Sequence, residues 1–283
     1  MGAQLVSSYP WAVFLASLPW TVLAVVVLLG ATFGVAVRLG KHAVVDIVWG
    51  LGFVAISAAS WLLSSQHGDP LRRGVLLALV TVWGVRLAAH IAARSRGHGE
   101  DPRYEALLDK ADGRNPRLHA LRSIYLPQGM VMWFVSLPVQ VGMFAPDGLA
   151  WLSWAGVALW SVGMVFEAVG DRQLAAFRAD PSSRGKVLDT GLWRYTRHPN
   201  YFGDACVWWG IFVVSAGAWP GILTVLSPLA MTYLLVKGTG KPLLEKGMAS
   251  TRPGYAQYVS RTSGFVPMPP RKHPIAQEAE EPC

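Results

Sequence analysis

Long stretches without charge are the feature that most limits the fold of this chain. Residues 11–37 contain no charged side chain, and residues 205–236 form a second uncharged run of 32 residues. A helix that crosses the hydrocarbon core of a bilayer needs about 20 mainly apolar residues. Only 15% of the residues are charged, against roughly a quarter in average soluble domains. The sequence therefore predicts an all-α integral membrane protein and argues against a soluble or disordered chain.

Seven membrane-spanning helices account for this apolar pattern. The first five predicted spans cover residues 11–37, 43–65, 74–93, 123–146 and 148–170. The run 205–236 is too long for one span, and the sequence SAGAWPG at residues 215–221 supplies a turn that divides it in two. Because the two halves are short, a re-entrant hairpin stays the alternative to two full spans.

The distribution of Lys and Arg predicts the orientation. With the N-terminus outside, 22 of the 25 Lys and Arg residues fall in inside segments, while Arg72 and Arg73 fall outside and Arg86 lies within a span. Cytoplasmic loops are enriched in these residues, so we expect the C-terminus to be cytoplasmic and the protein to lie in the cell inner membrane. The net charge of +8 then follows from topology, and no nucleic-acid partner is expected.

The domain organisation and the two cysteines place few further limits on the fold or the function. Residues 1–270 are predicted to form one membrane domain, and residues 271–283 a flexible tail rich in Pro, Glu and Ala. The first ten residues carry no Lys or Arg, which favours a membrane anchor over a cleaved signal peptide. Cys206 and Cys283 form no disulfide framework or metal pattern, so no metal site is expected. The sequence does not define the oligomeric state.

Ionisable side chains inside predicted spans are costly and usually mark functional sites. Six of them lie toward the inside ends of their spans: Asp46, Arg86, His90, Glu167, Asp171 and Asp204. Their shared depth predicts one polar chamber that opens inward. Structural roles stay open, with Asp46 as an acid favoured at a helix start, Arg86 as its ion-pair partner, and His90 as a satisfied core residue.

The densest polar stretch is LDTGLWRYTRHPNYFGD at residues 188–204. Two arginines, a histidine and an asparagine beside a helix start suit phosphate oxygens. Trp193, Tyr195 and Tyr201 offer rings on which an aromatic ligand can stack. Segments at the membrane interface are also often basic and aromatic, but they do not need an acid, an amide and a histidine at fixed places. We therefore interpret the stretch as a ligand site.

Residues 191–204 resemble the signature of the steroid 5α-reductase and sterol C14-reductase superfamily, and are especially similar to a bacterial branch, domain of unknown function 1295. Further matches are VDIVWG at 45–50, RSRGHGEDPRY at 94–104, PLLE at 242–245 and PGYAQY at 253–258. The resemblance extends from about residue 40 to residue 270. It implies a seven-helix membrane fold and NADPH-dependent reduction of a carbon–carbon double bond in a lipid.

The resemblance also implies a set of cofactor residues. Asn200 and Asp204 match family positions that contact the nicotinamide nucleotide, while Asp171 and Arg178 match an acid and an arginine near its adenosine and phosphate parts. The remaining expected cofactor residues are Glu167, Trp193, Tyr195, Arg197, His198, Tyr255 and Tyr258, together with Arg94 and Arg96. Because no glycine-rich dinucleotide fingerprint follows a strand, arginine side chains are expected to hold the phosphates.

The expected chemistry needs a proton donor. Hydride addition to a conjugated enone puts negative charge on the carbonyl oxygen, and a proton must then reach the α-carbon. The available polar groups are Asp46, Arg86, Tyr104 and Tyr201. The acid–tyrosine pair of the vertebrate enzymes does not transfer, because a rough alignment puts Trp83 at the tyrosine position. Asp46 is then either a protonated donor or an ionised orienting group.

Two other functions stay open. S-adenosylmethionine-dependent methyltransferases of the isoprenylcysteine and phospholipid type share the Arg-His-Pro-x-Tyr core, and Glu245, Tyr255 and Tyr258 would supply their later Glu and Tyr-x-x-Tyr. Asn200 and Asp204 favour the reductase. A lipid-binding or scaffold protein without catalysis is the third interpretation. For the reductase, steroid enones, polyprenyl lipids and unsaturated acyl chains all suit an apolar cavity between helices.

Overall fold

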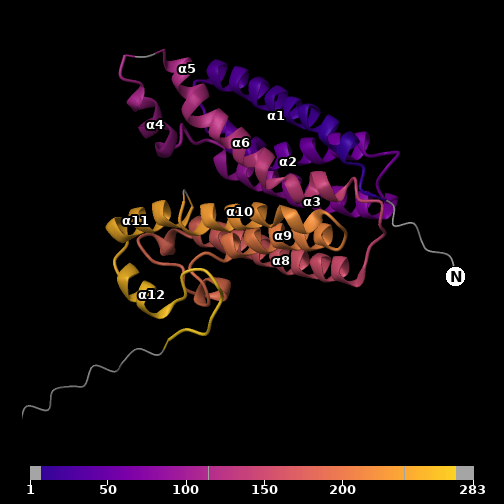
Figure 1. Cartoon of the computed structure of the whole chain (residues 1–283). Helices are drawn as coiled ribbons and strands as arrows, with labels where there is room; N and C mark the ends of the chain where they lie inside the picture. The colour runs from indigo at the N-terminus through magenta and orange to yellow at the C-terminus, as the bar shows by residue number, and fades with distance from the viewer. Residues whose placement is uncertain (1–7, 114, 239, 272–283) are drawn as a thin grey trace, which may run out of the picture. The chain divides into compact units, whose positions relative to one another are not determined.

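A computed structural model describes residues 8–113, 115–238 and 240–271 (Figure 1). Within these ranges every regular element is helical, apart from one isolated bridge between Thr196 and Ser263. The chain divides into two compact units: unit 1 comprises Met1–Trp160 and Trp208–Met231, and unit 2 comprises Ser161–Val207 and Thr232–Cys283. The predicted all-helical class is confirmed. Most of the predicted tail, with Cys283, lies outside the described residues.

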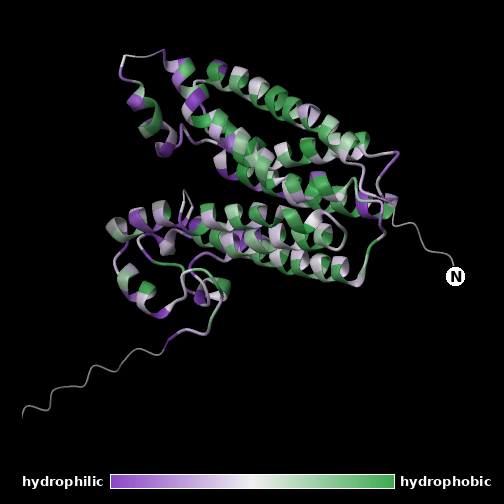
Figure 2. Cartoon of the chain, viewed as in Figure 1, coloured by the Kyte–Doolittle hydropathy of each residue, from purple (hydrophilic) through white to green (hydrophobic). Residues whose placement is uncertain are grey.

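Among the described residues, five helical segments are long and apolar enough to cross a membrane. They are Trp11–Leu39 (α1), Val44–Leu63 (α2), Pro70–Ser95 (α3), Pro116–Gly142 (α5 to α7) and Trp151–Ala179 (α8). They coincide with the first five predicted spans, and Figure 2 shows hydrophobic residues dominating their length. The protein is therefore a multi-pass membrane protein.

The predicted turn within the last apolar run is also present. Helix α9 (Pro199–Ala216) ends inside it, and the 3-10 turn η5 (Gly221–Val225) leads into α10 (Leu226–Val236). The apolar segment Gly221–Val236 is shorter than the five spans. Asn200 and Asp204 lie in the first two turns of α9, and this helix is not among the five candidate spans.

Short helices fill the segments around the spans. Their bounds are α4 (Pro102–Leu108), η1 (Asp109–Ala111), α5 (Pro116–Ala120), η2 (Leu121–Tyr125), α6 (Leu126–Val135), α7 (Leu137–Gly142), η3 (Pro181–Ser183), η4 (Gly191–Arg194), α11 (Lys241–Thr251) and α12 (Tyr255–Arg261). Three of them begin at a proline preceded by a capping side chain. Asp101, Asn115 and Asp180 accept backbone N–H groups of Arg103, Arg117 and Ser182 at 2.8–3.0 Å. Proline and a capping acid or amide are preferred at helix starts.

Two arginines that the sequence placed in an outside loop are instead buried in the first turn of α3. Asp69 caps that helix through a 2.8 Å bond from the Arg72 backbone N–H, so α3 begins at Pro70 and not at the predicted Gly74. Arg72 Nη1 donates to the Val214 carbonyl at 2.6 Å, and its Nη2 donates to the Gly148 carbonyl at 2.9 Å. Backbone carbonyls thus satisfy a guanidinium that would otherwise be costly to bury.

Aromatic rings form the centre of unit 1. The rings of Phe53, Trp83 and Trp208 lie 4.6–5.4 Å apart between centroids, and Trp83 and Trp208 are fully buried. Helices α2 and α3 approach closely beside these rings, since glycines face each other at the contact. A Cβ atom on Gly84 would lie only 2.5 Å from the Gly50 carbonyl oxygen. Trp83 is therefore part of the packed core, which explains why a ring without a hydroxyl occupies this position.

Glycines also bring two helices of unit 2 together. A Cβ atom on Gly163 of α8 would lie 2.5 Å from the Gly203 carbonyl oxygen, and one on Gly203 of α9 would lie 2.6 Å from the Glu167 backbone nitrogen. Two helical turns further along α8, a Cβ atom on Gly170 would lie 3.3 Å from the Asn200 backbone nitrogen, a less close approach. This backbone contact sets which side chains of α8 and α9 meet.

We predict that Gly203→Ala lowers the stability of the protein by about 1–3 kcal/mol, the usual cost of forcing an extra methyl group into a packed contact. Thermal unfolding in detergent measures the effect. Gly34→Ala is the matched control, because its Cβ faces open space in α1. The control should be neutral or stabilising by up to about 1 kcal/mol, since alanine is the better helix former. Equal effects of both substitutions would contradict the tight contact.

Candidate functional site

All predicted cofactor residues except Arg94 and Arg96 belong to unit 2. They come from α8, from residues 188–204, here called the motif segment, and from α12. Arg94 and Arg96 are exposed at the end of α3 in unit 1. The predicted catalytic residues divide as well, since Asp46, Arg86 and Tyr104 belong to unit 1 and Tyr201 to unit 2. The single chamber for all six ionisable residues of the spans stays a prediction.

The structure brings together an acid and an amide that lie 29 residues apart in sequence. Asn200 Nδ2 donates to Asp171 Oδ1 at 3.3 Å, and Asn200 Oδ1 accepts the Tyr201 backbone N–H at 3.1 Å. Asp171 and Glu167 are buried on α8, with exposed fractions of 6% and 3%. Asp204 is half-buried on α9, and Arg178 is exposed near the end of α8. Two of the expected cofactor residues, Asp171 on α8 and Asn200 at the start of α9, are therefore in direct contact.

The motif segment is held by buried aromatic side chains. Trp193 Nε1 donates to the Gly170 carbonyl at 3.1 Å, and the Tyr258 hydroxyl donates to the Trp193 carbonyl at 2.6 Å. Trp193 and Tyr258 are 7% and 2% exposed, so their rings are engaged in packing. Tyr195, by contrast, is 44% exposed and has a ring face open to a ligand. Of the predicted stacking residues, Tyr195 is the best placed.

Arg197 connects the motif segment to the C-terminal part of unit 2. Its Nε donates to Glu245 Oε1 at 2.8 Å, and its Nη1 donates to the Thr262 carbonyl at 2.6 Å. Its backbone N–H donates to the Ser263 carbonyl at 2.9 Å. With 8% of its surface exposed, Arg197 is a buried cation with several protein acceptors. Its Nε and Nη1 edges are therefore already engaged within the protein.

His198 shares the same carboxylate. Its Nε2 lies 3.0 Å from Glu245 Oε1, and its ring lies parallel to the Tyr201 ring with centroids 5.4 Å apart. Burial lowers the pKa of His198, the charges of Lys241 and Arg197 lower it further, and Glu245 opposes them. His198 is therefore neutral at pH 7. An ionised carboxylate only accepts hydrogen bonds, so the proton is on Nε2 and Nδ1 is an acceptor.

Glu245 was not among the cofactor residues predicted for the reductase, although it interacts with two of them, Arg197 and His198. Burial alone raises its pKa, but hydrogen bonds from Arg197 and His198, with the charges of Arg197 and Lys241, outweigh this and lower the pKa overall. Burial also raises the pKa of Tyr255 to about 12, so its hydroxyl stays protonated. The PLLE match contained a signal for Glu245, but its partners lie more than 45 residues away in sequence.

A second cluster lies at the start of α2 in unit 1. The Tyr104 hydroxyl donates to Asp46 Oδ1, and Gln128 Nε2 donates to the Tyr104 hydroxyl at 3.2 Å. Arg103 Nη2 forms an ion pair with Asp46 Oδ2 at 2.7 Å. Burial raises the pKa of Tyr104 and the charge of Asp46 adds to this, so the phenol stays protonated. Two predicted catalytic residues, Asp46 and Tyr104, are thus in direct contact.

Arg103 was not among the predicted site residues. A hydrogen bond with Asp101 is the largest of the effects that raise its pKa, and Asp46 adds a charge interaction. The sequence analysis suggested Arg86 as the ion-pair partner of Asp46, whereas in the structure Arg103 forms an ion pair with Asp46. Arg86 is half-buried within α3, as is His90 one turn later.

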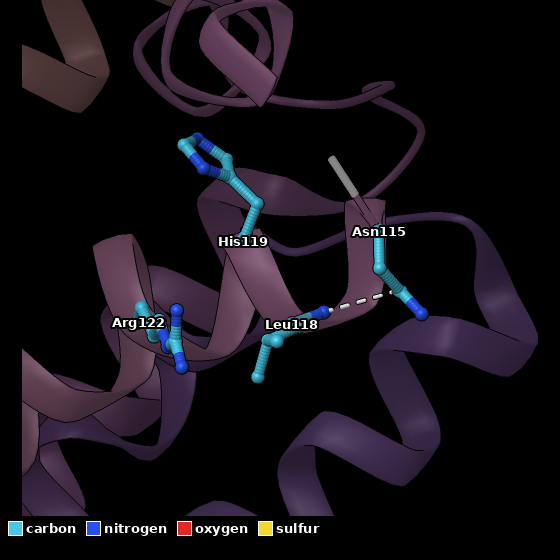
Figure 3. Close-up of a pocket in the computed structure, with 4 residues that line it drawn as sticks. All are labelled: Asn115, Leu118, His119 and Arg122. Carbon is cyan, nitrogen blue, oxygen red and sulfur yellow. Dashed lines mark hydrogen bonds between the residues drawn. The ribbon is translucent and has the colours of Figure 1, made fainter. Parts of the chain in front are cut away.

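Two hollows lie in unit 1, outside the predicted site residues. Figure 3 shows the first, of about 50 Å³, lined by Asn115, Leu118, His119 and Arg122. The second is an apolar hollow of about 590 Å³ between α1 and α2. Its lining includes Trp20, Leu23, Val27, Ala55, Ala59 and Leu62. A hollow with such a lining suits a hydrocarbon chain or ring system.

Comparison with known proteins identifies the family. Residues 32–262 match the model of the family described as protein of unknown function, DUF1295. The chain belongs to the DUF1295 family. The resemblance stated from the motifs is therefore confirmed.

The relatives of this DUF1295 chain extend to a steroid enzyme. It is 24% identical over 261 residues to an uncharacterised protein of Schizosaccharomyces pombe, which covers 83% of this chain and 75% of the relative. It is 31% identical over 91 residues to 3-oxo-5-alpha-steroid 4-dehydrogenase 1 of Mus musculus, which covers 32% of this chain and only 35% of that enzyme. No solved structure matches the chain.

We predict that the thermal stability of the protein falls as the pH drops below about 6.5, the ordinary pKa of histidine, and that His198→Gln falls less over the same range. The folded-state pKa of His198 is lowered, so this stability is present above the unfolded-state pKa and lost on acidification. Unfolding temperatures of both proteins are measured in detergent from about pH 7.5 to about pH 5, a range that includes the ordinary histidine pKa. Parallel pH curves for both proteins would contradict a buried neutral His198.

Proposed function

We propose that this DUF1295 protein is a membrane reductase that uses NADPH to reduce a conjugated or activated carbon–carbon double bond in a hydrophobic, lipid-like substrate. The observation that carries the proposal is the contact of Asp171 with Asn200, the acid and amide that the reductase resemblance assigns to one cofactor site. The partial match to a steroid dehydrogenase supports it. The α9 and η5–α10 segments are the sixth and seventh spans of this proposal, with a cytoplasmic C-terminus in the inner membrane.

The residues of unit 2 suit NADPH in their chemistry. Carboxylates such as Asp171 accept from ribose hydroxyls, and the exposed Tyr195 ring offers a stacking face. The exposed guanidinium of Arg178 suits phosphate oxygens. Gly264 lies beside two cationic side chains, so close that a Cβ atom at this position would contact both of them. The space that the glycine leaves beside these cations is where a phosphate group is expected. NADPH would thus be held by side chains and not by a glycine-rich loop.

The protein residues contribute orientation and a proton. NADPH, when bound, supplies a hydride to the double bond. Tyr104 is the proposed donor to a substrate oxygen on which negative charge develops: its phenol has a single hydrogen, which Asp46 accepts in this structure and which would turn to the substrate oxygen when substrate binds. Asp46 accepts from both Tyr104 and Arg103, which is the hydrogen-bonding pattern of a carboxylate, so it orients the phenol and is not itself the acid. Gln128 donates to the same phenol oxygen and fixes its position.

The lipid nature of the substrate rests on two features. The chain is a multi-pass membrane protein, and the hollow between α1 and α2 has an apolar lining. A hydrophobic substrate reaches such a protein laterally from the bilayer. Steroid enones, polyprenyl lipids and unsaturated acyl chains all meet this description.

A second candidate function is S-adenosylmethionine-dependent methyl transfer. One observation favours it, because Arg197, His198 and Glu245 form one hydrogen-bonded group in unit 2, near the buried Tyr255 and Tyr258. These are the residues that the methyltransferase resemblance requires. Lipids from cells with and without the gene separate the two functions by mass spectrometry. Reduction adds two hydrogen atoms to the substrate, whereas methylation adds a methyl group.

We predict that NADPH raises the unfolding temperature of the purified protein and that S-adenosylmethionine does not. At a ligand concentration of about 100 times Kd, binding to the folded state alone adds about 2.7 kcal/mol of stability. Asn200→Ala should remove most of this shift, because it removes the amide that contacts Asp171. Gln257→Ala, an exposed substitution on α12, is the control. Stabilisation by S-adenosylmethionine alone would contradict the reductase and support the methyltransferase.

We predict that Tyr104→Phe lowers kcat for the reduction by about 10²-fold or more, the usual contribution of a positioned acid. The affinity for NADPH should stay unchanged, because Tyr104 is in unit 1 and outside the predicted cofactor set. Tyr233→Phe, at a 64% exposed residue of α10, is the matched control and should retain wild-type kcat. A normal rate in Tyr104→Phe would exclude this phenol as the donor. The non-catalytic interpretation instead predicts that Asn200→Ala and Asp204→Ala leave cellular function unchanged.

A further inference from the structure

Two cationic side chains of unit 2 meet over one glycine. The position that a Cβ atom of Gly264 would occupy is 2.6 Å from Lys241 Nζ and 3.1 Å from Arg197 Nη2. The two cationic nitrogens are therefore within about 6 Å of each other, a separation at which like charges repel unless an anion joins them. Lys241 begins α11, Arg197 belongs to the motif segment, and Gly264 follows α12.

Among the described groups that interact at this point, the cations outnumber the anions. Glu245 carries one negative charge and is bonded to Arg197 through Nε and to His198 through Nε2. Lys241 is close enough to lower the pKa of both Glu245 and His198. Counting Lys241 and Arg197 against Glu245, with His198 neutral, leaves one positive charge at a half-buried position. Such a charge is stabilised by an anionic ligand.

The hydrogen-bonding geometry selects the type of anion. An ammonium and one edge of a guanidinium together suit a tetrahedral oxyanion, which accepts from both through different oxygens. The other edges of Arg197 are already fixed by Glu245 and by the carbonyls of Val259 and Thr262, so the guanidinium is preorganised. A residue larger than glycine at position 264 would fill the space beside both cations.

We propose that Lys241 and Arg197, above Gly264, bind a phosphate group of the nucleotide cofactor. This inference rests on the proposed function and refines it, because it assigns the phosphate to Lys241, which the sequence patterns did not mark. It also gives Arg197 two roles, since one side of its guanidinium holds the C-terminal segment and the other faces the ligand. The motif segment thus contributes to phosphate binding only when α11 and residues 262–264 are in place.

The test compares Lys241→Gln with Lys237→Gln. Lys237 is exposed at the end of α10 and is the matched control. Isothermal titration of the full-length protein in detergent measures binding of NADPH and, separately, of inorganic pyrophosphate. Loss of one charge-assisted contact should weaken both by about tenfold or more in Lys241→Gln and leave Lys237→Gln like wild type. Gly264→Ala should act in the same direction, and it keeps the test valid if Lys241→Gln fails to fold.

The outcomes separate this inference from the proposed function. If wild type and Lys241→Gln bind NADPH and pyrophosphate equally well, the phosphate site is wrong while the reductase proposal stands. If wild type binds pyrophosphate through Lys241 but not NADPH, an anion site is present, while its assignment to the cofactor and the reductase proposal both fail. Nanodiscs of phosphatidylglycerol and of phosphatidylcholine distinguish a lipid source. Loss of pyrophosphate binding only in phosphatidylglycerol would show that a lipid headgroup occupies the site, which would overturn the cofactor assignment.

Discussion

The ion pair between Glu245 and Arg197 is the interaction on which unit 2 depends. Both charged groups are largely removed from water, so burying either one without the other would cost folding free energy. His198 is buried beside them and is hydrogen-bonded to the same carboxylate. The carboxylate fixes one edge of the guanidinium and the tautomer of the imidazole. Backbone carbonyls after α12 fix a further edge. The tautomer of His198 and the attachment of the C-terminal segment follow from this one carboxylate, and the proposed phosphate site lies beside it.

Unit 1 uses a carboxylate in a similar way. Asp46 stands in the first turn of α2, where an acid is favoured, and accepts from Tyr104 and Arg103 of the short helix α4. That helix begins at Asp101 and Pro102, so the capping sequence places its tyrosine and arginine directly against the acid. In both units a segment outside the spans thus carries the donors, and one acid determines their positions.

The sequence predicted the parts of the fold that depend on local composition. Hydropathy located five spans and the turn at residues 215–221, because the bilayer requires long apolar helices and glycine with proline interrupts them. It placed Arg72 and Arg73 in a loop, whereas both are buried in α3: Arg72 donates to distant carbonyls such as that of Val214, and Arg73 donates to the Ser64 hydroxyl of the preceding turn. The motifs marked both Asp171 and Asn200, which are in contact in the structure, but Glu245, Arg103 and Lys241 have partners far along the chain, which spacing alone does not show.

The pairing of the motif segment with the end of the chain has a consequence for biosynthesis. Arg197 and Thr196 are bonded to groups 62–69 residues further along, including the Val259, Thr262 and Phe265 carbonyls. During translation, at about 5–20 residues per second, the motif therefore leaves the ribosome several seconds before its partners. Through that interval a buried arginine and histidine have no carboxylate. Maturation of this unit is thus completed only when the last helices, α11 and α12, have been synthesised.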